Sequence, residues 1–185
     1  MKKTILSARG LSKSFAHNGG QVHVISDANL DIYEGDFTVI MGASGSGKST
    51  MLYALSGMDR ATVGDVIFNG ENITEMSERK LAKLRCTAFG FVFQQIHLVS
   101  NLTLFENVAV PGYLDKSRSV EEVDSFADSL LEKMNISDIK TQLPAQCSGG
   151  EQQRCAIARA LINTPELVFR TNLQEHSTER IRLKS

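Results

Sequence analysis

The sequence lacks a charge excess, a membrane-length apolar run and a secretory leader pattern. Its 20 basic and 21 acidic residues give a formal net charge of -1, and no stretch is rich in Lys or Arg. Composition therefore gives no support for a nucleic-acid partner. No apolar run approaches the roughly 20 residues that a membrane-spanning helix needs, and Met1–Ile5 is followed by polar Ser7 and Arg9. We expect the chain to stay in the cytoplasm.

Cysteine is scarce, and no internal repeat is visible. Cys86, Cys147 and Cys155 are an odd set without metal-ligand spacing, which indicates reduced thiols rather than a disulfide framework. The chain has 185 residues, of which 42% are apolar. That is enough for one core, so we expect a single cytosolic α/β domain rather than two independent ones.

The N-terminal part has strand-like patterns. Short patterns over 4–10 and 29–32 flank a polar turn at 16–20 and predict a small β layer. Phe37–Met41 is a nearly continuous apolar run, typical of a strand that is covered on both faces of a parallel sheet. Further strands are predicted over 64–70, 88–94 and 166–169.

The second half is mostly helical in pattern. A short helix is predicted earlier, over 77–84, and three more over 104–110, 120–134 and 149–162. Pro111-Gly112 and the loop around Pro144 separate these three. A helical insert over about 95–162 is therefore expected.

The clearest motif lies between the apolar run 37–41 and a predicted helix. It consists of Gly42, Ala43, Ser44, Gly45, Ser46, Gly47, Lys48, Ser49 and Thr50. The pattern is G-x-x-x-x-G-K-[ST], in which glycines let backbone N–H groups approach phosphate oxygens at a helix N-terminus. Lys48 supplies positive charge, Ser49 a hydroxyl for Mg²⁺, and Thr50 mainly packing. The alternative, a Gly/Ser-rich loop that binds nothing, is disfavoured by the flanking elements.

A second motif selects among phosphate-binding families. The run Cys147-Ser148-Gly149-Gly150-Glu151 resembles the LSGGQ signature of ATP-binding cassette (ABC) proteins, and the following residues up to Leu161 resemble that family's helix. Ser148 and two glycines at a helix start form a second anion site, which in the family completes the ATP bound by a partner subunit. The resemblance implies a dimer. An ordinary helix N-cap is the alternative.

Weaker matches lie in the expected order around these motifs. Gln94 ends the run Gly90–Gln94 and resembles the family's Q-loop, a ligand of Mg²⁺ that couples the site to the membrane subunit. Phe15 stands where the family has an aromatic side chain that stacks on adenine, with core packing as the alternative. Leu98–Val108 resembles the stretch that contacts the permease.

The resemblance extends from Met1 through Phe169. The segments Met41–Gly45, Leu55–Asp59 and Gly90–Gln94 are most similar to the subfamily that serves lipoprotein release, macrolide export and antimicrobial-peptide export. It implies an α/β fold: a P-loop NTPase (RecA-like) core with an N-terminal antiparallel β layer and a helical signature subdomain. ATP and Mg²⁺ are the implied cofactors. A second nucleotide-binding subunit and an integral membrane permease are the implied partners, at the inner face of the cell membrane.

The chain departs from the family after Phe169. There the family continues Ala-Asp-Glu-Pro, giving the Walker B aspartate that orders Mg²⁺ and the glutamate that activates water, whereas this chain has Arg170, Thr171 and Asn172. Neither Thr171 nor Asn172 can act as a carboxylate. His176 lies too close behind the strand to be the family's switch histidine. No catalytic residue is identified, and the last strands of the core are expected to be missing.

We hypothesise that a one-base deletion near codon 170 shifted the reading frame and so caused this departure. The third bases of the codons for Arg170 to Thr178 can be chosen so that the same bases encode another peptide. Read from the third base of codon 170, they then encode Asp-Glu-Pro-Thr-Gly-Ala-Leu-Asn. We therefore expect an incomplete ABC-type domain over 1–169 and an out-of-frame tail over 170–185.

The alternatives are a catalytically inactive fragment that binds nucleotide weakly or only occupies partner subunits, and a non-transport ABC ATPase that acts on nucleic acid or ribosomes. Folding is expected to be marginal, because lost core strands expose sheet edges.

Overall fold

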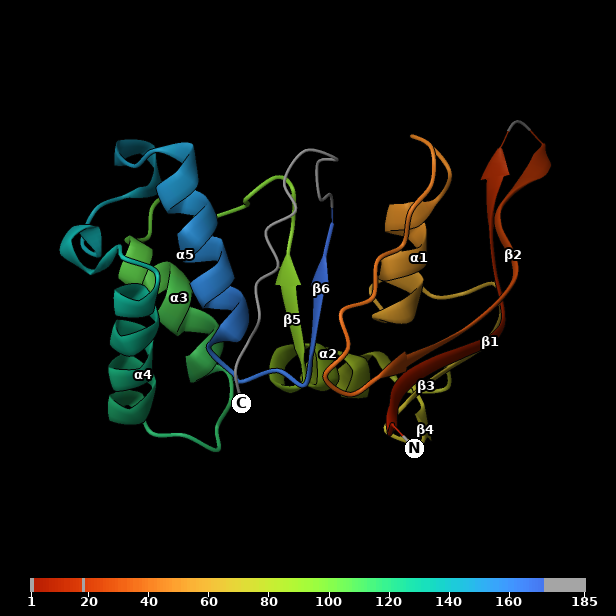
Figure 1. The fold of residues 1–185 in the computed structure, drawn as a ribbon, viewed down its shortest axis with the longest axis horizontal. Helices are drawn as coiled ribbons and strands as arrows, with labels where there is room; N and C mark the ends of the chain where they lie inside the picture. The colour runs from red at the N-terminus through yellow and green to blue at the C-terminus, as the bar shows by residue number, and fades with distance from the viewer. Residues whose placement is uncertain (1, 18, 172–185) are drawn as a thin grey trace. The chain divides into compact units, whose positions relative to one another are not determined.

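The structure is a computed structural model that describes residues 2–17 and 19–171. The chain divides into two compact units, one up to Arg85 and one from Cys86 (Figure 1). Each unit has its own sheet. None of the helices in the described ranges combines the length and hydropathy that a bilayer crossing demands.

A four-stranded antiparallel sheet forms most of the N-terminal unit. Its strands are β1 (Thr4–His17), β2 (Gly20–Tyr33), β3 (Val63–Phe68) and β4 (Glu71–Asn72), in the order β2-β1-β3-β4. The predicted N-terminal β layer is thus confirmed. Strands β1 and β2 are longer than the apolar patterns indicate, because their polar residues also pair: Ser14 lies opposite His23 and His17 opposite Gly20.

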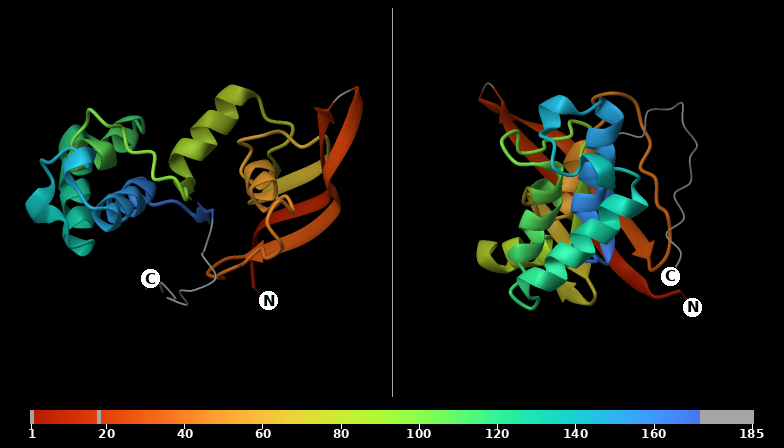
Figure 2. Two further views of the ribbon diagram at one scale, coloured as in Figure 1. Left: turned by 90° about the horizontal axis from the view of Figure 1, so that it is seen from above. Right: turned by 90° about the vertical axis from the view of Figure 1, so that its left-hand side faces the viewer.

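One helix and most of a second complete this unit, which ends at Arg85. They are α1 (Lys48–Leu55) and α2 (Glu78–Thr87). Figure 2 shows α1 lying alongside the sheet, where Ala54 and Leu55 are buried. The turn after α1 is held by α2, since Arg85 Nη1 donates to the carbonyl of Gly57 at 2.6 Å.

The prediction of a buried strand over Phe37–Met41 was wrong. These residues belong to no strand in the described part of the chain, and Phe37 and Met41 are 72% and 85% exposed. An apolar run identifies a segment that is able to pair, but only a neighbouring strand can satisfy its backbone N–H and carbonyl groups. The two sheets of the described chain do not include this segment, so it remains an extended connection.

A two-stranded parallel sheet opens and closes the C-terminal unit. Strand β5 (Phe89–Val92) pairs with β6 (Leu167–Arg170), with Phe89 opposite Leu167 and Val92 opposite Arg170. Aromatic rings cover the pair: Phe169 lies edge-on to Phe89 at 5.2 Å between centroids and stacks on Phe91 at 5.6 Å. Both strands were predicted from their apolar runs.

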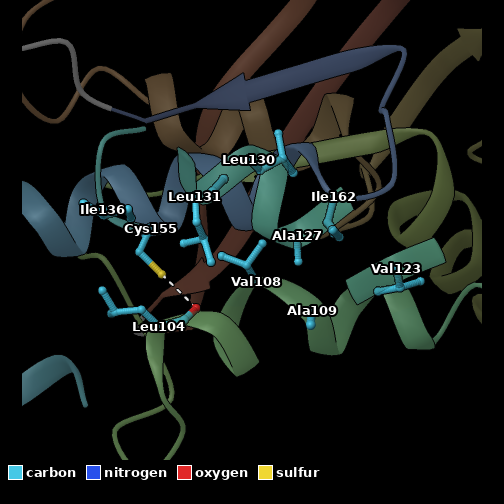
Figure 3. Close-up of a cluster of buried hydrophobic side chains, with 11 residues drawn as sticks. Leu104, Val108, Ala109, Val123, Ala127, Leu130, Leu131, Ile136, Cys155 and Ile162 are labelled. Carbon is cyan, nitrogen blue, oxygen red and sulfur yellow. Dashed lines mark hydrogen bonds between the residues drawn. The ribbon is translucent and has the colours of Figure 1, made fainter. Parts of the chain in front are cut away.

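Three helices between these strands enclose the core of the C-terminal unit. They are α3 (Leu104–Tyr113), α4 (Val120–Lys133) and α5 (Gly149–Leu161), with short 3₁₀ turns at Ser137–Ile139 and Pro144–Gln146. The helical subdomain predicted for this part of the chain is confirmed. Its core is shown in Figure 3 and includes Leu104, Val108, Ala109, Val123, Ala127, Leu130, Leu131, Ile136, Cys155, Ala158 and Ile162. Cys155 also donates its thiol to the carbonyl of Leu104 at 3.4 Å.

Helix α3 continues through Pro111 and Gly112, which were predicted to end it. The reason is packing. A Cβ on Gly112 would lie 2.6 Å from Val123 and 3.0 Å from Ile162, so the missing side chain lets the last turn of α3 approach α4 and α5. The carbonyl of Pro111 in turn accepts a hydrogen bond from Asn163 Nδ2 at 3.0 Å.

Candidate nucleotide-binding site

The phosphate loop lies at the start of α1. Gly47 is the N-cap residue with a φ of 86°, and Gly45 has a φ of 78°. Both angles fall in the left-handed region that glycine adopts without strain. A Cβ on Gly47 would lie 2.7 Å from the side chain of Val24. The glycines therefore both turn the chain and allow the loop to approach β2 closely.

Lys48 is folded back onto this loop. Its ammonium group donates to the carbonyl oxygens of Gly42 at 2.6 Å and Ala43 at 2.7 Å. Ser49 is exposed at the helix start, where the first N–H groups have no intrahelical acceptor and the helix dipole favours anions. The arrangement provides the donors that a phosphate group needs.

Phe15 lies on β1 in the same unit, and it is 42% exposed. One of its faces is occupied by Lys13, whose ammonium nitrogen lies 4.9 Å from the ring centroid. The prediction weighed an aromatic platform against core packing. The exposed fraction shows that Phe15 is not a core residue of the described unit.

Gln94 lies just beyond β5, at the end of the parallel sheet. Its backbone N–H donates to Thr171 Oγ1 at 3.1 Å, and the N–H of Thr171 donates to the carbonyl of Val92 at 3.1 Å. The structure thus brings Gln94, which was predicted as a site residue, next to Thr171. Asn172 and His176 lie outside the described residues.

The loop after Gln94 is fastened to α5 by Arg159. Its guanidinium donates to the carbonyls of His97 at 2.8 Å and Ile96 at 3.1 Å. His97 adopts a left-handed φ of 46° and contacts the ring of Phe93 edge-on. Burial lowers the pKa of the Arg159 guanidinium below its ordinary value. The group keeps its charge, because the ordinary pKa of an arginine lies far above neutral pH.

The signature residues form the N-terminus of α5. Ser148 is the N-cap, and Gly149 and Gly150 open the helix. Glu151 closes a capping box: it accepts from Ser148 N at 2.6 Å and Ser148 Oγ at 2.7 Å, while its own N–H donates to Ser148 Oγ at 3.4 Å. These hydrogen bonds lower the pKa of the Glu151 carboxyl. The box explains why a glutamate is tolerated beside two glycines.

Comparison with known proteins addresses the family. The family model described as ABC transporter matches residues 25–170. The chain belongs to the ABC transporter family. It is therefore an ABC-type ATP-binding subunit with the P-loop NTPase fold, an N-terminal antiparallel β layer and a helical subdomain. The match ends at Arg170.

Individual relatives support the assignment to the ABC family. The "Lipoprotein-releasing system ATP-binding protein LolD" of Buchnera aphidicola subsp. Schizaphis graminum (strain Sg) is 39% identical over 172 residues, covering 93% of this chain and 75% of the relative. Two dimeric structures of the MJ0796 cassette, one a post-hydrolysis state bound to ADP and Pi, each match with a TM-score of 0.83 at 36% identity, covering 90% of this chain and 73% of theirs. CbiO1 from Clostridium perfringens, part of the cbiONQ complex, gives a TM-score of 0.77 at 26% identity and covers 91% of this chain and 65% of its own.

Two contacts of this ABC subunit were not anticipated from its sequence. Arg159 and Lys13 each hold a segment that carries a predicted site residue, Gln94 and Phe15 respectively. Lys13 could have been found, because residues two apart in a strand share a face. Arg159 could not, since its acceptors are backbone carbonyls more than 60 positions away, and carbonyls leave no trace in the residue pattern.

Proposed function

We propose that this chain binds MgATP as the ATP-binding subunit of an ABC transporter of the lipoprotein-release, macrolide-export and peptide-export group. The observation that carries the proposal is the phosphate loop at the start of α1, with Lys48 at its centre. Residues 42–50 hold the phosphates, with Ser49 and Gln94 as ligands of Mg²⁺ and Phe15 as the adenine platform. Ser148, Gly149 and Gly150 contact the ATP held by a second copy.

The partners follow from this role. The chain dimerises with a second nucleotide-binding subunit and docks, through residues 98–108, on an integral membrane permease at the cytoplasmic face of the membrane. No nucleic acid is needed, and the balanced charge disfavours one. The relative named LolD supports lipoprotein release as the transport task. A non-transport ABC ATPase is the less favoured placement.

Hydrolysis by this chain is proposed to be impaired. Thr171 offers a neutral hydroxyl that accepts the Gln94 N–H, where the reaction needs a carboxylate to order Mg²⁺. A second candidate function follows: a catalytically inactive chain that binds nucleotide weakly and acts by occupying a partner subunit. In both cases residues 1–169 form the ABC-type domain, with its helical insert over about 95–162, and residues 170–185 form an out-of-frame tail.

The experiment compares this chain with a version whose reading frame is restored at codon 170. Both are checked by thermal melting, and MgATP binding and turnover are then measured, with Lys48→Ala as the control for each. We expect binding by both chains and turnover only by the restored one. Turnover by this chain at a comparable rate would refute the importance of the carboxylates. A gene sequence without a family-like continuation in the alternative frame contradicts the frame hypothesis.

A further inference from the structure

Lys13 is the least exposed lysine among those whose ion pairs are resolved in the N-terminal unit. Its side chain is 11% exposed, and the ammonium group donates to Asp59 Oδ1 at 2.6 Å and to the carbonyl of Arg60 at 2.7 Å. A lysine normally keeps its ammonium group in water. Here two acceptors fix it instead, at 4.9 Å from the centroid of the Phe15 ring.

The acceptors of Lys13 are tied to the phosphate-loop helix. The N–H of Asp59 donates to the carbonyl of Tyr53, within α1, at 3.1 Å. A few residues on, Thr62 exchanges two hydrogen bonds with β1: its N–H donates to the carbonyl of Ser12 at 2.8 Å, and its Oγ1 accepts from the N–H of Ser14 at 3.0 Å. Residues 59–62 therefore bridge the end of α1 to the strand that bears Phe15.

The geometry points to Lys13 as a positioning residue that sets the Phe15 ring for stacking on the nucleotide base. A cation over one face of an aromatic ring is attracted to it, so Lys13 holds the ring in place and leaves its exposed part for a ligand. A ring that is already ordered loses less freedom when a base stacks on it. The inference rests on the proposed function, since it requires that the chain binds ATP.

The test distinguishes binding of the nucleotide base from binding of the phosphates. MgATP contacts both the platform and the phosphate loop, whereas magnesium tripolyphosphate contacts only the loop. Binding of both ligands is measured by titration calorimetry for the full chain and for Lys13→Met, which keeps the apolar stem and removes the charge. The matched control is Lys80→Met, at an exposed lysine of α2.

We expect Lys13→Met to weaken MgATP binding about three- to tenfold and to leave tripolyphosphate binding unchanged. Lys80→Met should change neither. Equal loss for both ligands, or no loss for MgATP, overturns the inference, since a merely structural role of Lys13 cannot distinguish the two ligands.

A second variant tests the same role in case Lys13→Met fails to fold. Asp59→Asn keeps the shape of the side chain and weakens the anchor of Lys13, so it should shift MgATP binding in the same direction by a smaller factor. Unchanged MgATP binding by this variant and by Lys13→Met contradicts the role assigned to Lys13. If the unmodified chain binds neither ligand, nucleotide binding itself is refuted. If it binds both equally tightly, only the base platform is.

Discussion

At the residue scale, Lys48 donates two hydrogen bonds to carbonyls of its own loop, and a bound phosphate group would take up the same donors. A hydrogen bond between charged groups contributes about 1.5–3 kcal/mol. We therefore expect Lys48→Ala to weaken MgATP binding by about tenfold or more. Titration against Lys80→Ala, at an exposed lysine of α2, provides the comparison, and equal affinities for the two variants would contradict the assignment.

Ser148 gives a second prediction at this scale. As the N-cap of α5 it accepts from the N–H of Glu151, and replacing a capping serine with alanine costs about 1 kcal/mol. Ser148→Ala should lower the free energy of unfolding by about that amount in urea titrations. Ser129→Ala is the control, since Ser129 lies within α4 and donates to the carbonyl of Phe126 instead of capping a helix. A loss as large in the control would argue against the cap.

The stability that the capping box of Ser148 and Glu151 provides should depend on pH. Hydrogen bonds from Ser148 lower the pKa of Glu151 in the folded chain. A lowered folded pKa means that the carboxylate stabilises the fold above the ordinary glutamate range and loses this contribution as the pH falls through the folded value. The difference in the free energy of unfolding between the chain and Glu151→Gln should therefore be present near pH 7 and shrink as the pH falls below the ordinary glutamate range. A gap that grows on acidification would contradict the sign.

At the scale of elements, the close approach of α3 to α4 depends on Gly112. Alanine normally favours a helix over glycine by about 1 kcal/mol, but a Cβ here would lie 2.6 Å from Val123. Overpacking of this kind costs about 1–3 kcal/mol. Gly112→Ala should thus lower the melting temperature. Gly149→Ala is the matched control at a helical glycine with open space around it, and it should be neutral or stabilising.

The elements also show how far the sequence could be read. Helices α3, α4 and α5 were predicted because each repeats apolar residues at helical spacing, and α4 and α5 end where those patterns end. The predicted end of α3 was wrong, because Gly112 packs against Val123 and Ile162, which lie outside α3. Phe37–Met41 was wrong for the same physical reason: strand formation depends on a neighbour that the apolar run itself does not contain. The site motifs were readable because they are local in sequence.

At the scale of the whole molecule, the exposed run Phe37–Met41 is a liability for solubility. Unpaired apolar segments with strand propensity associate with one another. We expect the chain to self-associate in a concentration-dependent manner, detected by light scattering, and Phe37→Ser to reduce it. Phe126→Ser is the control within the partly buried rim of the helical core, where the same change should destabilise the chain instead. Equal scattering by the chain and Phe37→Ser would contradict this explanation.

Helix α5 has a mechanical consequence. Ser148 lies at its N-terminal end and Arg159 near its C-terminal end, about 16.5 Å apart at a rise of 1.5 Å per residue. A hydrogen-bonded helix resists compression along its axis, so a displacement at one end of α5 is passed to the other end. We therefore expect a displacement of Ser148 along that axis to reach the carbonyls of Ile96 and His97, which accept hydrogen bonds from Arg159. If Ser148 contacts the nucleotide of a second copy, as proposed, helix α5 links that contact to the segment that follows Gln94.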